Sequence, residues 1–217
     1  IILYANIINM TVGLTALMVV YQTLPILIRS HPPAGLGGDA SSIASVQLPY
    51  MIVSLIFSVA SGFLVSRFGN LKPTMLGTIV TTIGFFILFI YHFTETSIAT
   101  VLIIVAVGLA LMQIGSVNVV LTSTPKQFSG ISLGMNLLIY LIASSVGTVI
   151  AGAYMQSDQI STSSSPGIVT SYPSPASYNM IFLTATVISL ASVIFAILLN
   201  RNKRSADRNI NEPKVPI

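Results

Sequence analysis

Cysteine is absent from the chain, and charged residues make up only 6% of its 217 residues. The absence of cysteine excludes a disulfide framework, a thiolate metal site and a cysteine nucleophile. An ordinary soluble domain has roughly 25% charged residues, so this chain has too little charge for a soluble surface. Hydrophobic residues instead make up 53% of the chain, and its mean hydropathy is +0.90. Lipid tails solvate such a chain, whereas in water it would aggregate.

Six apolar stretches are each long enough to cross a bilayer, since a spanning helix needs about 20 predominantly apolar residues. They do not alternate apolar and polar residues as the strands of a membrane barrel do. Because lipid offers no partner for backbone polar groups, such runs must be helical. The sequence predicts an all-α membrane protein with six transmembrane helices, at residues 2–27, 43–65, 74–91, 98–121, 131–155 and 178–199.

The remaining segments are polar connections and a polar end. The longest connection, residues 156–177, is rich in Ser, Thr and Pro and is expected to be a flexible loop. We divide the chain into a six-helix transmembrane domain, 1–200, and a polar cytoplasmic tail, 201–217, which is expected to be partly disordered.

Basic residues give the orientation, because cytoplasmic loops of membrane proteins carry an excess of Lys and Arg. Six helices place both chain ends on one side. The opposite side then carries a single basic residue, Arg29. We therefore expect a multi-pass protein of the cell membrane with both ends cytoplasmic, where the basic residues are Arg67, Lys72, Lys126, Arg201, Lys203, Arg204, Arg208 and Lys214.

The sequence carries no signal of an enzyme or of a nucleic-acid-binding protein. Its two histidines, His31 and His92, are at predicted helix ends without a carboxylate cluster, and no phosphate-binding loop or metal-ligand spacing occurs. We expect no catalytic residue, no cofactor and no bound metal. The net charge of +4 is assigned to the cytoplasmic membrane surface, not to nucleic acid.

The start of the chain shows no signal-peptide pattern, since Ile1 lies within an apolar run that continues for a full span. We expect that the sequence is the second half of a larger protein, whose first half would precede Ile1.

Two segments resemble the major facilitator superfamily. GFLVSRFGNLK, from Gly62 to Lys72, is similar to the family's signature loop, roughly G-x-L-x-D-R-x-G-R-[RK], which is repeated more weakly between the eighth and ninth helices. Ser66 and Asn70 depart from this pattern. The segment PKQFSGISLGMNLLIYLIASSVGTVIAG, from Pro125 to Gly152, is similar to the tenth-to-eleventh helix region of drug-exporting members. The matching residues of the loop are Gly62, Leu64, Arg67 and Gly69.

The resemblance implies the C-terminal six-helix half of a permease of twelve or fourteen helices. Such a protein moves a small solute by alternating access, and the similarity to drug-exporting members implies drug/proton antiport. Its partners would be the lipid bilayer, the solute and the N-terminal half. The resemblance implies a gating role for Gly62, Arg67, Gly69 and Lys72.

The resemblance implies that the first, second, fourth and fifth helices line the central cavity or face the other half, so amides within these helices are the candidate solute-binding residues. The centres of the six predicted helices hold no Asp, Glu, Lys, Arg or His, so a proton-coupling carboxylate is expected in the other half. The candidates are Asn6, Asn9, Gln22, Gln113 and Asn136.

Other interpretations remain open at this point. The chain could be a polytopic assembly partner or anchor without transport activity, or a channel. Any amide could form a structural bond between helices, and Arg67 and Lys72 could only fix topology. Pro25 could mark a helix end or a gate-like break. Two stripes of small residues predict close helix packing: Ala143, Gly147, Ala151, and Ser54, Ser58, Gly62.

Overall fold

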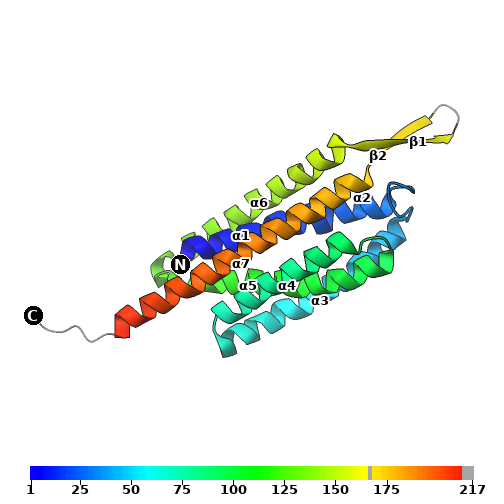
Figure 1. Cartoon of the computed structure of the whole chain (residues 1–217). Helices are drawn as coiled ribbons and strands as arrows, with labels where there is room; N and C mark the ends of the chain where they lie inside the picture. The colour runs from blue at the N-terminus through cyan, green and yellow to red at the C-terminus, as the bar shows by residue number, and fades with distance from the viewer. Residues whose placement is uncertain (166–167, 212–217) are drawn as a thin grey trace, which may run out of the picture.

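The computed structural model describes residues 1–165 and 168–211, with the side chains of residues 1–161 and 170–203. These residues form a bundle of long helices packed side by side (Figure 1). The predicted all-α fold is confirmed, because each predicted span overlaps one helical segment long and apolar enough to cross a membrane. In the described part of the chain these segments are Ile2–Arg29, Ala40–Phe68, Leu71–Ile90, Glu95–Ser123, Lys126–Ser157 and Pro175–Lys203.

The first span changes its helix type along its length. α1 (Ile2–Thr15) is followed by a π-helical segment, η1 (Ala16–Thr23), and by α2 (Leu24–Arg29). Pro25 has no N–H to donate, and its ring would clash with the carbonyl four residues earlier, so a wider helix before it relieves the conflict. Pro25 therefore neither ends nor breaks the helix.

The other helices run alternately up and down. Their bounds are α3 (Ala40–Phe68), α4 (Leu71–Ile90), α5 (Glu95–Ser123), η2 (Lys126–Phe128), α6 (Ser129–Ser157) and α7 (Pro175–Asn211). α5 packs against α1, α3 and α4, and α7 packs against α1 and α4.

The start of α3 is capped by Asp39, whose Oδ1 accepts bonds from the backbone N–H of Ser41 and Ser42. The Ser41 hydroxyl also donates to this carboxylate and lowers the pKa of Asp39.

Glycine allows α1 and α6 to approach closely. A Cβ atom on Gly147 would lie 2.3 Å from the backbone oxygen of Leu14, and one on Gly13 would lie 2.5 Å from that of Tyr140. Ala143 and Ala151, on the same stripe as Gly147, are buried. The packing predicted for this stripe is thus what the structure shows.

In two segments that were expected to be irregular, the described residues form strands or helix. Residues 156–177 contain an antiparallel hairpin of β1 (Gln159–Ser165) and β2 (Ile168–Pro173), with Gln159 paired to Pro173. The structure therefore shows paired strands where the sequence analysis expected a loop without regular structure. α7 continues to Asn211, so the first part of the predicted tail is helical, while residues 212–217 lie outside the described residues.

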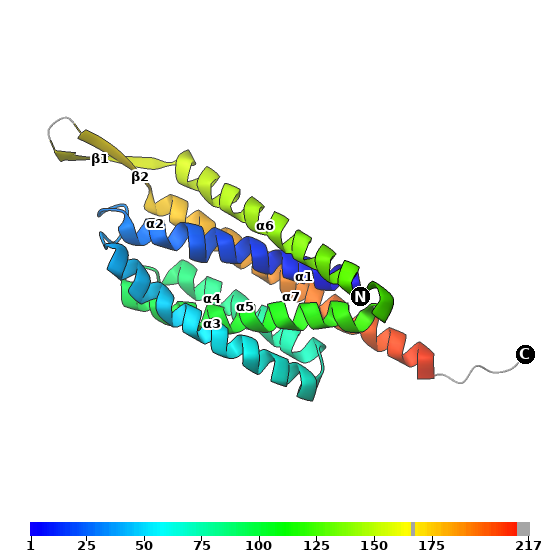
Figure 2. The same ribbon diagram turned by 180° about the vertical axis from the view of Figure 1, so that it is seen from behind.

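The two ends of the bundle differ. Residue 1 and the end of α7 lie at one end, which we call the tail end, and the hairpin lies at the opposite, hairpin end (Figures 1 and 2). Residue 1 and the last described residue, Asn211, are therefore on one side of the bundle, as six spans require. The turn between α3 and α4, formed by Gly69 and Asn70, also lies at the tail end.

Candidate functional site

A cavity of about 330 Å³ lies between four of the spans. The lining comes from the first span, α3, α5 and α6, the four helices that the family resemblance assigned to the central cavity. None of the described lining residues is charged. They are Val12, Ala16, Tyr21, Tyr50, Met51, Ser54, Leu55, Ser58, Leu109, Ala110, Gln113 and Tyr140.

Three tyrosines give the cavity an aromatic wall. Tyr21 of η1 and Tyr50 of α3 meet edge to face, with ring centroids 6.2 Å apart and planes at 82°. Tyr140 enters the same lining from α6. A tyrosine offers an apolar ring face and a hydroxyl that donates or accepts a hydrogen bond. The wall can therefore stack an aromatic solute and bond its polar groups.

Gln113 and two serines add neutral polar groups. Ser58 donates its hydroxyl to the Ser54 carbonyl at 2.6 Å, which leaves the oxygen of Ser58 able to accept a bond. The Gln113 side chain has no hydrogen-bond partner within the described part of the chain. It is half-buried in the lining, so its amide can donate to and accept from a bound molecule. No group of this set changes its charge at physiological pH.

The other predicted amides lie in a different place. Asn136 of α6 donates to Asn6 Oδ1 at 2.7 Å and accepts from Asn9 Nδ2 at 2.8 Å. Asn9 and Asn136 are each only 2% exposed. We call these three residues the amide cluster. It joins α1 to α6, and none of its members is among the residues that line the cavity.

The π-helical segment is supported from the neighbouring helix α3. Gln47 donates its side-chain amide to the Val20 carbonyl at 2.9 Å, so this amide has a structural role. Gln22, on the same segment, is half-buried and is not among the described residues that line the cavity.

The signature-like loop is a tight turn between α3 and α4. Gly69 ends α3 at φ +79°, a conformation that L side chains rarely adopt. Asn70 ties the turn to α5, because its amide donates to the Asn118 carbonyl at 3.1 Å and to Thr122 Oγ1 at 2.8 Å. Arg67 is exposed, with its guanidinium 5.5 Å from the centroid of the Phe68 ring.

The two remaining loop candidates, Gly62 and Lys72, take no part in the bonds that Asn70 makes to α5. A Cβ atom on Gly62 would meet nothing within 4 Å. The close packing predicted for the stripe of Ser54, Ser58 and Gly62 is thus absent from the described residues, and both serines line the cavity instead. Lys72 is exposed in the first turn of α4.

Reasoning from the sequence missed the three cavity tyrosines and Asn70. Asn70 stands where the family pattern usually has Arg, so it was counted as a departure and not as a contact residue. The signal that could have found the tyrosines is their position within spans assigned to the cavity, since Tyr carries a polar hydroxyl that lipid does not satisfy.

Comparison with protein families places the chain in the major facilitator superfamily, whose model matches residues 3–216. The chain belongs to this family and is a multi-pass membrane protein with the fold of one six-helix half. A comparison with curated protein sequences gave no significant match.

Among solved structures the fold is similar to the crystal structure of a POT family transporter in complex with 5-aminolevulinic acid. The TM-score is 0.65 and the sequence identity 16%. The likeness covers 92% of this chain and 38% of the transporter chain, so this chain spans well under half of that protein's length.

Proposed function

We propose that the protein is a secondary transporter that moves a small solute by alternating access, with this chain forming one wall of the central cavity. The cavity lined by tyrosines, serines and Gln113 carries the proposal. The family match and the transporter-like fold support it. In this mechanism an N-terminal half would face the exposed surface of α3, on which Leu55, Val59 and Phe63 are each more than 70% exposed.

The cavity favours an amphipathic aromatic solute, as the drug-exporter resemblance would imply. Stacking on Tyr21, Tyr50 and Tyr140 provides apolar contact, and Gln113 provides one directional polar contact. Since no lining residue is ionisable near neutral pH, this half would recognise the solute, and proton coupling would depend on a carboxylate of the other half.

In our proposal the protein lies in the cell membrane and its tail end faces the cytoplasm. Arg67, Lys72, Lys126 and Lys203 lie at this end, and Arg29 lies at the hairpin end. Cysteine substitution tests this, since the chain has no native cysteine. Ser161→Cys should react with an impermeant maleimide added outside intact cells, and Asn202→Cys should react only after the membrane is opened. The opposite result would reverse the orientation.

Labelling within the cavity tests the transport proposal. Ser54→Cys should be reachable by the impermeant maleimide through the aqueous cavity, and aromatic amphipathic solutes should slow its labelling whereas sugars of similar size should not. Ser192→Cys is the matched control, because Ser192 on α7 is fully buried and should stay unlabelled throughout.

Two outcomes would contradict the proposal. If Ser54→Cys is as inert as Ser192→Cys, the cavity is closed by packing, and an anchor or assembly role is favoured. If the solute flux through the protein in proteoliposomes rises in proportion to solute concentration without saturating, the protein is a channel and not an alternating-access transporter.

A further inference from the structure

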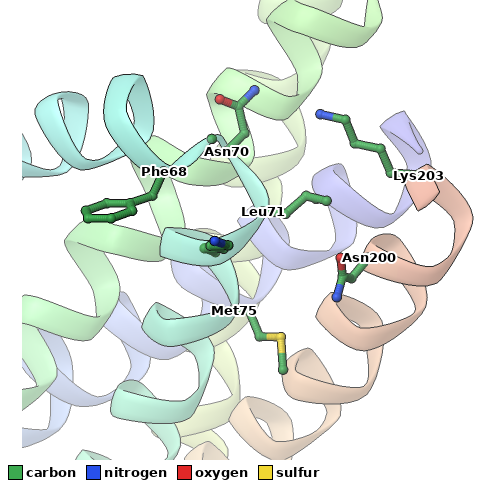
Figure 3. Close-up of a pocket in the computed structure, with 8 residues that line it drawn as sticks. Phe68, Asn70, Leu71, Met75, Asn200 and Lys203 are labelled. Carbon is green, nitrogen blue, oxygen red and sulfur yellow. The ribbon is translucent and has the colours of Figure 1, made fainter. Parts of the chain in front are cut away.

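A second cavity, of about 250 Å³, lies at the tail end between the start of α4 and α7. Figure 3 shows Asn200 and Lys203 of α7 on one side and Phe68, Asn70, Leu71 and Met75 on the other. Lys72 completes the set of charged groups, and no acidic residue is among those that line the cavity. Two lysines from different helices thus line one concave site, and none of its described lining residues is acidic.

The start of α4 adds to the positive potential of this site. A helix N-terminus carries unpaired backbone N–H groups and a partial positive charge. Asn70, the N-cap residue of α4, accepts no cap bond from the backbone of α4, and its Nδ2 donates to Asn118 and Thr122 of α5. Leu71 and Lys72, the first two residues of this helix, both line the cavity.

An apolar groove of about 300 Å³ adjoins the cavity and shares Phe68 and Lys72 with it. Apart from Lys72 its lining is apolar: Leu64, Phe68, Pro73, Leu76 and Leu111. Leu76 is 53% exposed and begins a stripe of exposed apolar residues along α4, which continues through Ile79, Ile83, Phe86 and Ile90. Such a stripe on a spanning helix faces lipid tails.

We propose that this joint site binds an anionic phospholipid of the bilayer, with the phosphate between Lys72 and Lys203 and an acyl chain in the groove beside Phe68. A free phosphate would use the lysines but not the groove, and a neutral acyl chain would use the groove but not the lysines. The site lies where the α3–α4 turn meets α7, so a bound lipid would tie the turn to α7.

The test uses tryptophan fluorescence, because the chain contains no tryptophan. The Phe68→Trp protein is placed in phosphatidylcholine nanodiscs that contain a small fraction of phosphatidylglycerol with brominated acyl chains. We expect stronger quenching than with the same fraction of brominated phosphatidylcholine. The apparent affinity should fall about fivefold for each of Lys72→Gln and Lys203→Gln, as expected for a lysine at an anionic membrane surface.

Lys126→Gln is the matched control, since Lys126 is a basic residue of the same end that does not line the site. It should leave the quenching unchanged. Equal quenching by the two brominated lipids, or an equal effect of Lys126→Gln, would overturn the proposal. Glycerol 3-phosphate is also added to the Phe68→Trp protein in nanodiscs of phosphatidylcholine alone. If it changes the tryptophan fluorescence in the same concentration range, the site binds free phosphate and the lipid assignment is wrong.

A second measurement avoids any effect of the tryptophan itself. The protein with its native Phe68 is purified from membranes, and the phosphatidylglycerol retained per protein is quantified by mass spectrometry. Lys72→Gln with Lys203→Gln should lose this lipid, and Lys126→Gln should retain it. Retention by the double variant would contradict the proposal even if the fluorescence result agreed. The outcome does not depend on which solute the protein transports.

Discussion

The amide cluster and the tyrosine-lined cavity are neighbours in the bundle, yet their polar groups are used differently. In the cluster, Asn136 bonds to both Asn6 and Asn9, and Asn9 and Asn136 are almost fully buried. In the cavity, Gln113, Tyr21 and Tyr140 are among the lining residues and keep part of their surface exposed, whereas Tyr50 is buried. Residue type alone does not separate the two regions, since amides occur in both.

The difference follows from how closely the helices approach. α1 and α6 touch through Gly13 and Gly147, so polar groups between them have no room for a ligand and bond across the contact, except Asn9 Oδ1, which has no partner among the described residues. α3 packs against α2 and α5, and the cavity lies between α3 and the first span. A polar group there keeps bonding capacity for a solute. The comparison therefore predicts stability effects in the first region and affinity effects in the second.

The largest expected effect on stability comes from disrupting the close contact between α1 and α6. Gly147→Val should lower the free energy of unfolding by about 3 kcal/mol, because the new side chain meets the Leu14 backbone, which a rotamer change cannot move. Gly152→Val on the same helix is the control, since a Cβ there meets nothing within 4 Å. Thermal unfolding in one detergent measures both. An equal loss in the two variants would show that the contact does not hold the helices together.

The amide cluster should give the next largest effect. Asn136→Leu removes the partner of Asn6 and Asn9 and should destabilise the protein by about 1–2 kcal/mol. The concentration of solute that half-saturates transport should stay unchanged. A shift of that concentration at normal stability would place Asn136 in the solute site, as the sequence analysis expected.

The fold was predictable from the sequence because the bilayer imposes a simple rule. Uninterrupted apolar runs must be helical, so the spans were found to within a few residues. The hairpin was missed although its sequence carries a signal. Pro166 and Gly167, a turn-forming pair in sequence, separate the β-branched residues Ile160 and Thr162 from Ile168 and Val169. The continuation of α7 was missed because charged residues were taken as a sign of disorder, whereas Lys and Arg favour helices.

The site was predictable only in part. The choice of helices was made from the family resemblance, and the cavity lies between those helices. The choice of residues required the rotation of each helix about its axis, which a span without charges does not reveal. Thus Gln113 lines the cavity, while Asn9 and Asn136 meet across a contact whose register depends on Gly13 and Gly147.

Cavity residues should change affinity without changing stability. Gln113→Leu should raise the half-saturating solute concentration about two- to tenfold, the effect of losing one hydrogen bond. The free energy of unfolding should change by less than about 0.5 kcal/mol, because the replaced amide has no partner among the described residues. This variant and Asn136→Leu make the same chemical change in the two regions. If Gln113→Leu and Asn136→Leu change stability and the half-saturating concentration alike, the cavity and the amide cluster do not differ in the way proposed.

Gln22 should give the smallest effect of the predicted site residues. It is half-buried in η1, lacks a hydrogen-bond partner among the described side chains and is not among those that line the cavity. Gln22→Ala should therefore change stability by less than about 0.5 kcal/mol and leave the half-saturating concentration unchanged. The same two measurements check it, with Gln113→Leu as the positive control. An affinity loss as large as that of Gln113→Leu would mean that the first span turns Gln22 toward the solute during transport.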